Sequence, residues 1–228
     1  MDYDTDDDRL TAAEQLAEHD PRAGAEALRA IARDHSVDDD IRLEAAGRLP
    51  EVDQAAAADA LRAIARDHSV DDDIRLEAAS RLPEVDQRAA AEAFRAIARD
   101  HMVDDDIRLE AAGRLPELDE GVAAEALRAI ARDHMVDDDI RLEAASRLPD
   151  IDQAAAADAF QAIARDHSVD DELRADAAGQ LASLGPQAAA EAFHGIPDGR
   201  PRFRRPLGGT LTRPPPPPSP PRPPRPPR

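Results

Sequence analysis

An aspartate, a histidine and a serine stand side by side in the tripeptide Asp34-His35-Ser36, and these are the residue types of a hydrolase triad. The nucleophile, the base and the orienting carboxylate of a triad are brought together by the fold, and three consecutive residues cannot adopt that geometry. Methionines, Met102 and Met135, replace the serine in two later copies of the same segment. The sequence therefore predicts no catalytic role for this tripeptide.

Histidine recurs at one position of a repeated segment, as His35, His68, His101, His134 and His167. Stacked helices lie about 8–10 Å apart, whereas zinc lies about 2 Å from each nitrogen ligand, so equivalent histidines cannot share an ion. We expect each histidine to be half-buried, to close a helix and to bond to the terminal carbonyls of that helix. A pH-sensitive role in these acidic surroundings is the alternative.

The acidic N-terminus is similar to the start of a calcium-binding loop, because Asp2, Asp4 and Asp6 alternate as ligands do there. The required glycine is replaced by Asp7, however, and the twelfth position holds Ala13 in place of glutamate. Solvated charge and helix capping explain these aspartates, and the sequence predicts neither a metal nor a cofactor.

Charge is divided unevenly along the chain, whose formal net charge is −20. Residues 196–228 hold eight of the 29 Arg and one of the 49 acidic residues, which leaves 21 against 48, or −27, in residues 1–195. Phosphate binding needs a basic surface, so we expect no direct binding of nucleic acid by residues 1–195. Only the basic end of the chain could reach phosphates.

The chain contains no cysteine, which excludes disulfides and thiolate metal sites. Its first residues, MDYDTDDDRL, are acidic where a signal peptide is basic and then apolar. No apolar run approaches the roughly 20 residues that span a bilayer. We therefore expect no membrane span and a cytoplasmic location.

A 33-residue segment recurs along the chain, beginning RDHSVDDDIRLEAA at Arg33 and returning at Arg66, Arg99, Arg132 and, in altered form, Arg165. The first two copies, residues 33–65 and 66–98, differ at only four positions. A fixed period of 20–50 residues indicates a stacked array, in which no unit buries its apolar face alone. Aromatic residues are only 2%, so the core must consist of Ala, Leu and Ile.

The sequence of each unit predicts two helices. The first runs from about Gln54 to His68, with Asp53 as its N-cap, and it is rich in alanine, the best helix former. The second starts after Asp71, where further aspartates lie near the positive end of the helix dipole. It ends at Leu82-Pro83, because a residue before proline is disfavoured in the α conformation.

With 100° of rotation per residue, the apolar residues of the second helix are expected to form a broad arc on its surface. In the first copy the arc consists of Ile41, Leu43, Ala45, Ala46 and Leu49. The arc is wide enough to contact both the partner helix and the next unit. One arginine per unit falls inside it: Arg42, Arg75, Arg108 and Arg141. A guanidinium in that position needs a carboxylate, which the Asp-rich turns supply.

The pattern D-D-D-I-R-L-E-A-A-x-R-L, at residues 38–49, 71–82, 104–115 and 137–148, resembles the second helix of HEAT-type repeats. A variant, DDELRADAAGQL, keeps the same frame at residues 170–181. The resemblance covers about residues 5–195 and implies an all-α fold, a right-handed α-solenoid or superhelix of about six two-helix units, with an Asp–Arg ladder between neighbours. Tetratricopeptide repeats, the main rival, need aromatic and glycine positions that these units lack.

Residues 196–228 form a second region, which holds 14 of the 20 prolines and ends in RPPPPPSPPRPPRPPR. Such a sequence favours polyproline II or disorder, and we expect a disordered, basic tail after an array spanning residues 1–195. The motif P-x-x-P-x-R, which SH3-type grooves accept, occurs at Pro217–Arg222, Pro220–Arg225 and Pro223–Arg228. A basic arm that contacts the acidic body, an anionic surface or nucleic acid is another interpretation, beside an unselected tail.

We expect a non-enzymatic protein–protein interaction scaffold that presents a repeated acidic helical face to a basic or extended protein partner. The expected binding residues lie on the polar side of each second helix: Asp40, Glu44, Arg48, Asp73, Glu77, Arg81, Asp106, Glu110, Arg114, Asp139, Glu143 and Arg147. Charge steers such an association and makes it sensitive to salt.

Two other functions stay open. One is lyase or isomerase activity on a bound cofactor, by analogy with HEAT-like bilin lyases, and it requires a pocket lined by residues that do not repeat. The other is a spacer or sensor array in a larger assembly, which should tolerate the loss of one unit.

Overall fold

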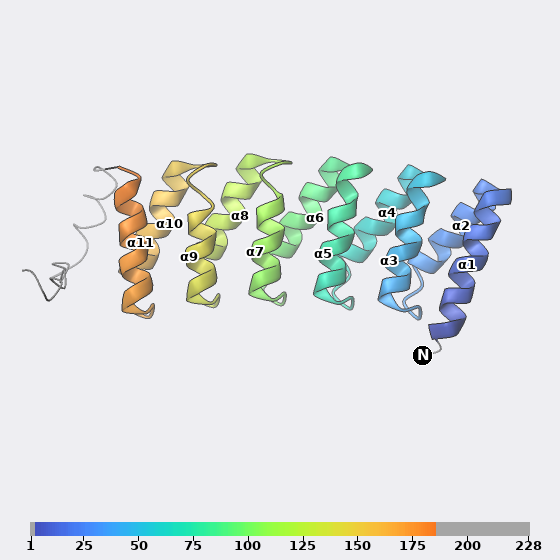
Figure 1. The fold of residues 1–228 in the computed structure, drawn as a ribbon, viewed down its shortest axis with the longest axis horizontal. Helices are drawn as coiled ribbons and strands as arrows, with labels where there is room; N and C mark the ends of the chain where they lie inside the picture. Colours follow the sequence, from blue (N-terminus) through green and yellow to red (C-terminus); the bar gives the residue numbers. More distant parts are fainter. Residues whose placement is uncertain (1–2, 186–228) are drawn as a thin grey trace, which may run out of the picture. The chain divides into compact units, whose positions relative to one another are not determined.

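The computed structural model describes the backbone of residues 3–185 and the side chains of residues 5–185, and within these limits the chain is helical with connecting turns (Figure 1). The α-helices are α1 (Tyr3–His19), α2 (Pro21–Ala32), α3 (Asp39–Arg48), α4 (Gln54–Ala65), α5 (Asp72–Arg81), α6 (Gln87–Arg99), α7 (Asp105–Arg114), α8 (Glu120–Arg132), α9 (Asp138–Ser146), α10 (Gln153–Arg165) and α11 (Asp171–Ser183). Two short 3-10 helices are η1 (Leu49–Glu51) and η2 (Leu82–Glu84).

The helices of the array form two rows that run side by side (Figure 1). The even-numbered helices from α2 to α10 contact one another in order, and the odd-numbered helices from α1 to α11 do the same. Each even-numbered helix also packs against the odd-numbered helix that follows it, and the pair is one unit. This arrangement confirms the predicted array of repeated helical pairs, with α1 standing before the first complete pair.

Local sequence explains where the helices begin and end. Asp53 caps α4 as predicted, because its carboxylate accepts a hydrogen bond from the backbone N–H of Ala56 at 2.9 Å. The expected end of this helix at His68 is wrong, since α4 ends at Ala65. Asp67 stops it by accepting hydrogen bonds from both the backbone N–H and the hydroxyl of Ser69, at 3.0 and 2.6 Å, which builds a tight turn.

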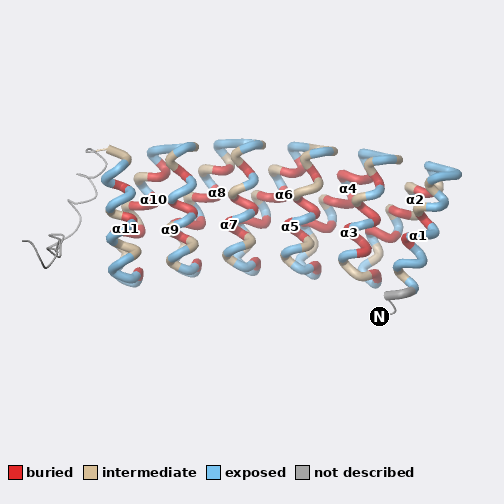
Figure 2. The backbone as a smooth tube through the Cα atoms, in the orientation of Figure 1, coloured by how far each residue is buried: buried red, intermediate tan, exposed pale blue. Residues whose placement is uncertain are grey.

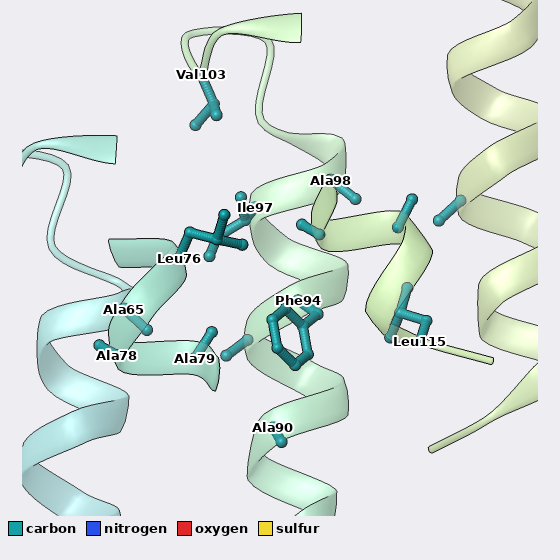
Figure 3. Close-up of a cluster of buried hydrophobic side chains, with 14 of the residues drawn as sticks. Ala65, Leu76, Ala78, Ala79, Ala90, Phe94, Ile97, Ala98, Val103 and Leu115 are labelled. Carbon is teal, nitrogen blue, oxygen red and sulfur yellow. The ribbon is translucent and has the colours of Figure 1, made fainter. Parts of the chain in front are cut away.

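Buried residues recur along the whole array (Figure 2), and their small and branched apolar side chains form one continuous core. Alanines such as Ala78 and Ala79 of α5 have no exposed surface, so neighbouring helices approach closely. Figure 3 shows Phe94 of α6 between Ala79 and Leu115, which belong to two successive units. The core of each unit is therefore completed by its neighbours, as the repeat period predicts.

Two further sequence predictions concern membrane spans and the basic tail. Within the described residues no helix is both long enough and apolar enough to cross a membrane. The predicted basic tail, residues 196–228, lies outside the described residues.

Candidate protein-binding surface

A ladder of buried arginines links each unit to the next. The Arg75 guanidinium donates through Nη1 to Asp72 of its own helix at 2.7 Å and through Nη2 to Asp100 of the next unit at 3.0 Å. Its Nε faces the carbonyl of Ala65 at 3.5 Å. The two carboxylate contacts recur at Arg42, Arg108 and Arg141. Carboxylates from the Asp-rich turns therefore neutralise these arginines, as predicted.

The ladder arginines are almost completely buried. Arg75 is only 3% exposed, so the loss of its partners would leave an uncompensated charge in the protein. A matching pair precedes the first complete unit, where Arg9 binds Asp34 at 3.0 Å, but that arginine is exposed. Hence the repeat pattern already begins in α1.

The ladder aspartates that each arginine reaches in the next unit have lowered pKa values. Burial raises the pKa of Asp67, but hydrogen bonds from Ser69 and the guanidinium of Arg42 outweigh it and lower the pKa from 3.8 to about 2. The pKa values of Asp100 and Asp133 are also lowered, by a similar balance of burial against hydrogen bonds. These carboxylates bind arginines of the preceding unit and are therefore not free to bind a partner protein.

The prediction for the repeated histidines is wrong. The His68 side chain is 72% exposed, and its Nδ1 lies 3.0 Å from a carboxylate oxygen of Asp100 in the next unit. Equivalent pairs join His35 to Asp67 and His101 to Asp133. Because α4 ends three residues earlier than expected, the histidine lies in the turn and contacts the ladder aspartate, not the last helical carbonyls.

The residues of the Asp-His-Ser tripeptide bind two different carboxylates. The Ser36 hydroxyl donates to Asp34 at 2.6 Å, whereas Nδ1 of His35 lies 3.1 Å from Asp67 of the next unit. The serine is thus paired with a carboxylate and not with the imidazole. This geometry serves the turn and differs from that of a nucleophile next to its base.

The twelve predicted binding residues separate into paired and unpaired charges. Glutamate and arginine pair four residues apart in each of the four units that carry the predicted residues, as in Glu44–Arg48 at 3.0 Å and Glu143–Arg147 at 2.7 Å. Each of these side chains is at least 39% exposed, so the pairs are solvated. Their charges cancel within the helix, and the glutamates are weaker candidates for recognition than the sequence indicated.

Two of the four arginines also bind backbone of the preceding unit. Nη1 of Arg81 donates to the carbonyl of Leu43 at 3.4 Å, and a Cβ at Gly47 would lie only 2.6 Å from that nitrogen. Arg147 crosses Gly113 in the same way. Glycine at these positions therefore makes room for an arginine that ties two units together.

The unit between these two glycines, which contains α5, has no such space for an arginine of the next unit. Ser80 stands at the position equivalent to glycine, and Arg114 of the next unit contacts only Glu110 of its own helix. The Arg114 side chain is 57% exposed. Sequence reasoning treated the four arginines as equivalent, although the alternation of glycine and serine was visible in the repeat.

A row of exposed aspartates is the part of the predicted face that is free to bind. These residues occupy the second position of successive odd-numbered helices, and we call them the aspartate row: Asp40, Asp73, Asp106 and Asp139. Within residues 5–185 none of the four carboxylates has an ion pair or a hydrogen bond. They lie along the edge where α3, α5, α7 and α9 begin, the lower edge in Figure 1, here called the helix-start edge.

Two exposed methionines lie on the same edge and were not predicted as binding residues. Met102 and Met135, in the turns before α7 and α9, are each 87% exposed. Their signal in the sequence was the replacement of serine in two adjacent copies. They place apolar surface among the carboxylates at the middle of the array.

In the described part of the chain no three or more His, Asp or Glu side chains are grouped so that they could hold a metal ion. Of the aspartates compared with a calcium loop, Asp2 lies outside the described residues, and only backbone is described for Asp4.

The fold and this surface define a helical repeat protein with an acidic edge. No protein-family model matches the chain, and no curated protein matches it in sequence.

Proposed function

We propose that this chain is a HEAT-type α-solenoid that acts as a non-enzymatic scaffold for a basic, extended protein partner. The observation that carries the proposal is the aspartate row, four exposed carboxylates without partners in the described array, one in each of four successive units. A row of like charges at a regular interval suits a ligand whose positive charges are also spaced along a line.

The contrast with the other charges supports this choice of surface. The ladder aspartates are bound to buried arginines, and the glutamates of the predicted face are bound to arginines on their own helices. The aspartate row alone among the predicted binding residues keeps its full negative charge available. Its position in the first turn of each helix also fixes the backbone that carries it.

The test uses two variants of the full chain that remove the same formal charge. The row variant changes the four residues of the aspartate row to asparagine. The control variant changes four exposed carboxylates on the opposite edge, in η1, η2 and the equivalent turns, to amides: Glu51→Gln, Glu84→Gln, Glu117→Gln and Asp150→Asn. Circular dichroism checks that both variants keep the helix content of the original chain.

A displayed library of random peptides is selected on the original chain, and the enriched peptides are then tested on both variants. We expect basic, extended sequences that bind the control variant normally, bind the row variant at least fivefold more weakly and weaken further as salt rises. Equal binding to the row variant and the original chain would show that the aspartate row is not the recognition surface.

A further inference from the structure

Met102 and Met135 have no role in folding that the structure shows. The other three copies have serine at this position, and the hydroxyl of Ser69 donates to Asp67 at 2.6 Å within the turn. A methionine cannot make that hydrogen bond, and at 87% exposure it buries almost no apolar surface. The turns before α7 and α9 thus forgo a stabilising contact and expose two flexible, apolar side chains at the centre of the helix-start edge.

These methionines are surrounded by negative charge. The turn from Arg99 to Asp106 holds one arginine against four aspartates, and Arg99 itself binds Glu125 at 2.6 Å. Met102 precedes Asp106 of the aspartate row by four residues. Apolar contact and free carboxylates therefore occur together, which fits a ligand that combines apolar rings with positive charges.

The aspartate row has a fixed interval. Neighbouring odd-numbered helices pack directly against one another, and packed helices lie about 8–10 Å apart. At the helix-start edge the carboxylate of Asp105 accepts a hydrogen bond from the backbone N–H of Asp137 at 3.2 Å, which joins the beginnings of α7 and α9. Equivalent carboxylates consequently recur about every 9 Å along this edge.

The sequence of this chain contains a segment with the same interval. In RPPPPPSPPRPPRPPR, residues 213–228, every arginine is separated from the next by a multiple of three residues: Arg213, Arg222, Arg225 and Arg228. Polyproline II has three residues per turn and a rise of about 3.1 Å per residue. In that conformation the arginines share one face, and the last three recur about every 9 Å.

We infer that the helix-start edge around Met102 and Met135 binds residues 213–228 of a second copy of this chain in an extended conformation. The arginines of the segment pair with successive carboxylates of the aspartate row, and its proline rings pack on the two methionines. This inference rests on the proposed function and names the partner. A single exposed ion pair contributes little, so binding depends on several pairs forming at once on a ligand that is already extended.

Register is the property that separates this inference from general charge attraction. A peptide with the same composition but all four arginines at one end has the same charge and cannot place them on successive units. The probe is therefore a fluorescent peptide of residues 213–228, compared with the rearranged peptide PPPPPSPPPPPPRRRR. The receptor is the full chain with its own four segment arginines changed to glutamine, so that its segment cannot compete.

We expect the native peptide to bind this receptor at least fivefold more tightly than the rearranged peptide at low salt. The substitutions of the row variant should abolish that preference, whereas those of the control variant should leave it unchanged. Met102→Ser with Met135→Ser, which restores the residue of the other copies, should weaken the native peptide about threefold and raise the unfolding temperature. The unmodified chain should self-associate in sedimentation at low salt, and the glutamine variant should not.

Equal affinity for the two peptides, with binding still dependent on the aspartate row, overturns the register and leaves the proposed function standing. If the native peptide binds a receptor with the row-variant substitutions as tightly as one without them, both this inference and the proposed function are overturned. An absence of self-association by the unmodified chain, despite tight peptide binding, overturns the assignment to a second copy.

Discussion

Removal of one ladder arginine tests how the units are held together. Arg108 lies in the middle of the array, is 3% exposed and binds Asp105 at 2.8 Å and Asp133 at 3.1 Å. Arg108→Met replaces the arginine with an apolar side chain of similar length and removes the charge. Each hydrogen bond to a charged group contributes about 1.5–3 kcal/mol, and the two carboxylates remain partly accessible to water. We therefore expect a loss of about 2–4 kcal/mol in the free energy of unfolding.

The chain contains a matched control for this substitution. Arg174 occupies the equivalent position in α11 and contacts Asp171 of its own helix at 3.1 Å, with a side chain 28% exposed. The sequence has Gly199 where the aspartate of a further unit would stand. Arg174→Met should therefore cost less than about 1 kcal/mol, as expected for a solvated pair.

Urea unfolding followed by circular dichroism compares the two variants with the original chain. In a third variant Asp133→Asn accompanies Arg108→Met, and we expect it to recover part of the loss because one uncompensated carboxylate is gone. Equal destabilisation by Arg108→Met and Arg174→Met would refute the reasoning, since it would mean that the contact between units contributes nothing.

Two further predictions concern pH and close packing. The pKa of Asp67 is about 2 in the folded protein and 3.8 ordinarily, so its contribution to stability is fully present above about pH 4 and is lost as the pH falls toward 2; thermal unfolding across this range should show the loss, and Asp67→Asn should reduce it. Gly24→Ala should cost about 1–3 kcal/mol, because the added Cβ would lie 2.3 Å from the backbone of Ala17. Gly47→Ala should change stability by less than about 1 kcal/mol, because its Cβ meets only the end of the Arg81 side chain. Urea unfolding measures both changes, and equal losses of stability would contradict the distinction.

Much of the fold could be predicted because the repeat displays the same local rules several times. Aspartate caps, alanine-rich helices and the proline after each second helix are short-range signals, and apart from the earlier end of α4 the helices appear where these signals place them. The buried Arg75 could also be predicted, because its place in the apolar arc demanded a carboxylate from a neighbouring turn.

The remaining features depend on contacts between units, which helical periodicity alone does not specify. His68 was misplaced because the turn at Asp67 shortens α4, and only the fold brings Asp100 to the imidazole. The acidic face was predicted as one set of residues, whereas pairing on the same helix neutralises Glu44 and leaves Asp40 free. The four-residue spacing of Glu44 and Arg48 already favours that pair in the sequence, whereas the lack of a partner for the Asp40 carboxylate depends on side-chain geometry.

Deletion of one complete unit tests most directly whether each unit gains its core from equivalent neighbours. Removing residues 66–98 joins Ala65 to Arg99, the equivalent of Arg66, so that Arg42 would meet Asp100 in place of Asp67. Circular dichroism of the shortened chain should show the same helix content per residue and a cooperative urea transition with a smaller dependence on urea. A loss of helix content per residue would contradict an array of interchangeable stacked pairs.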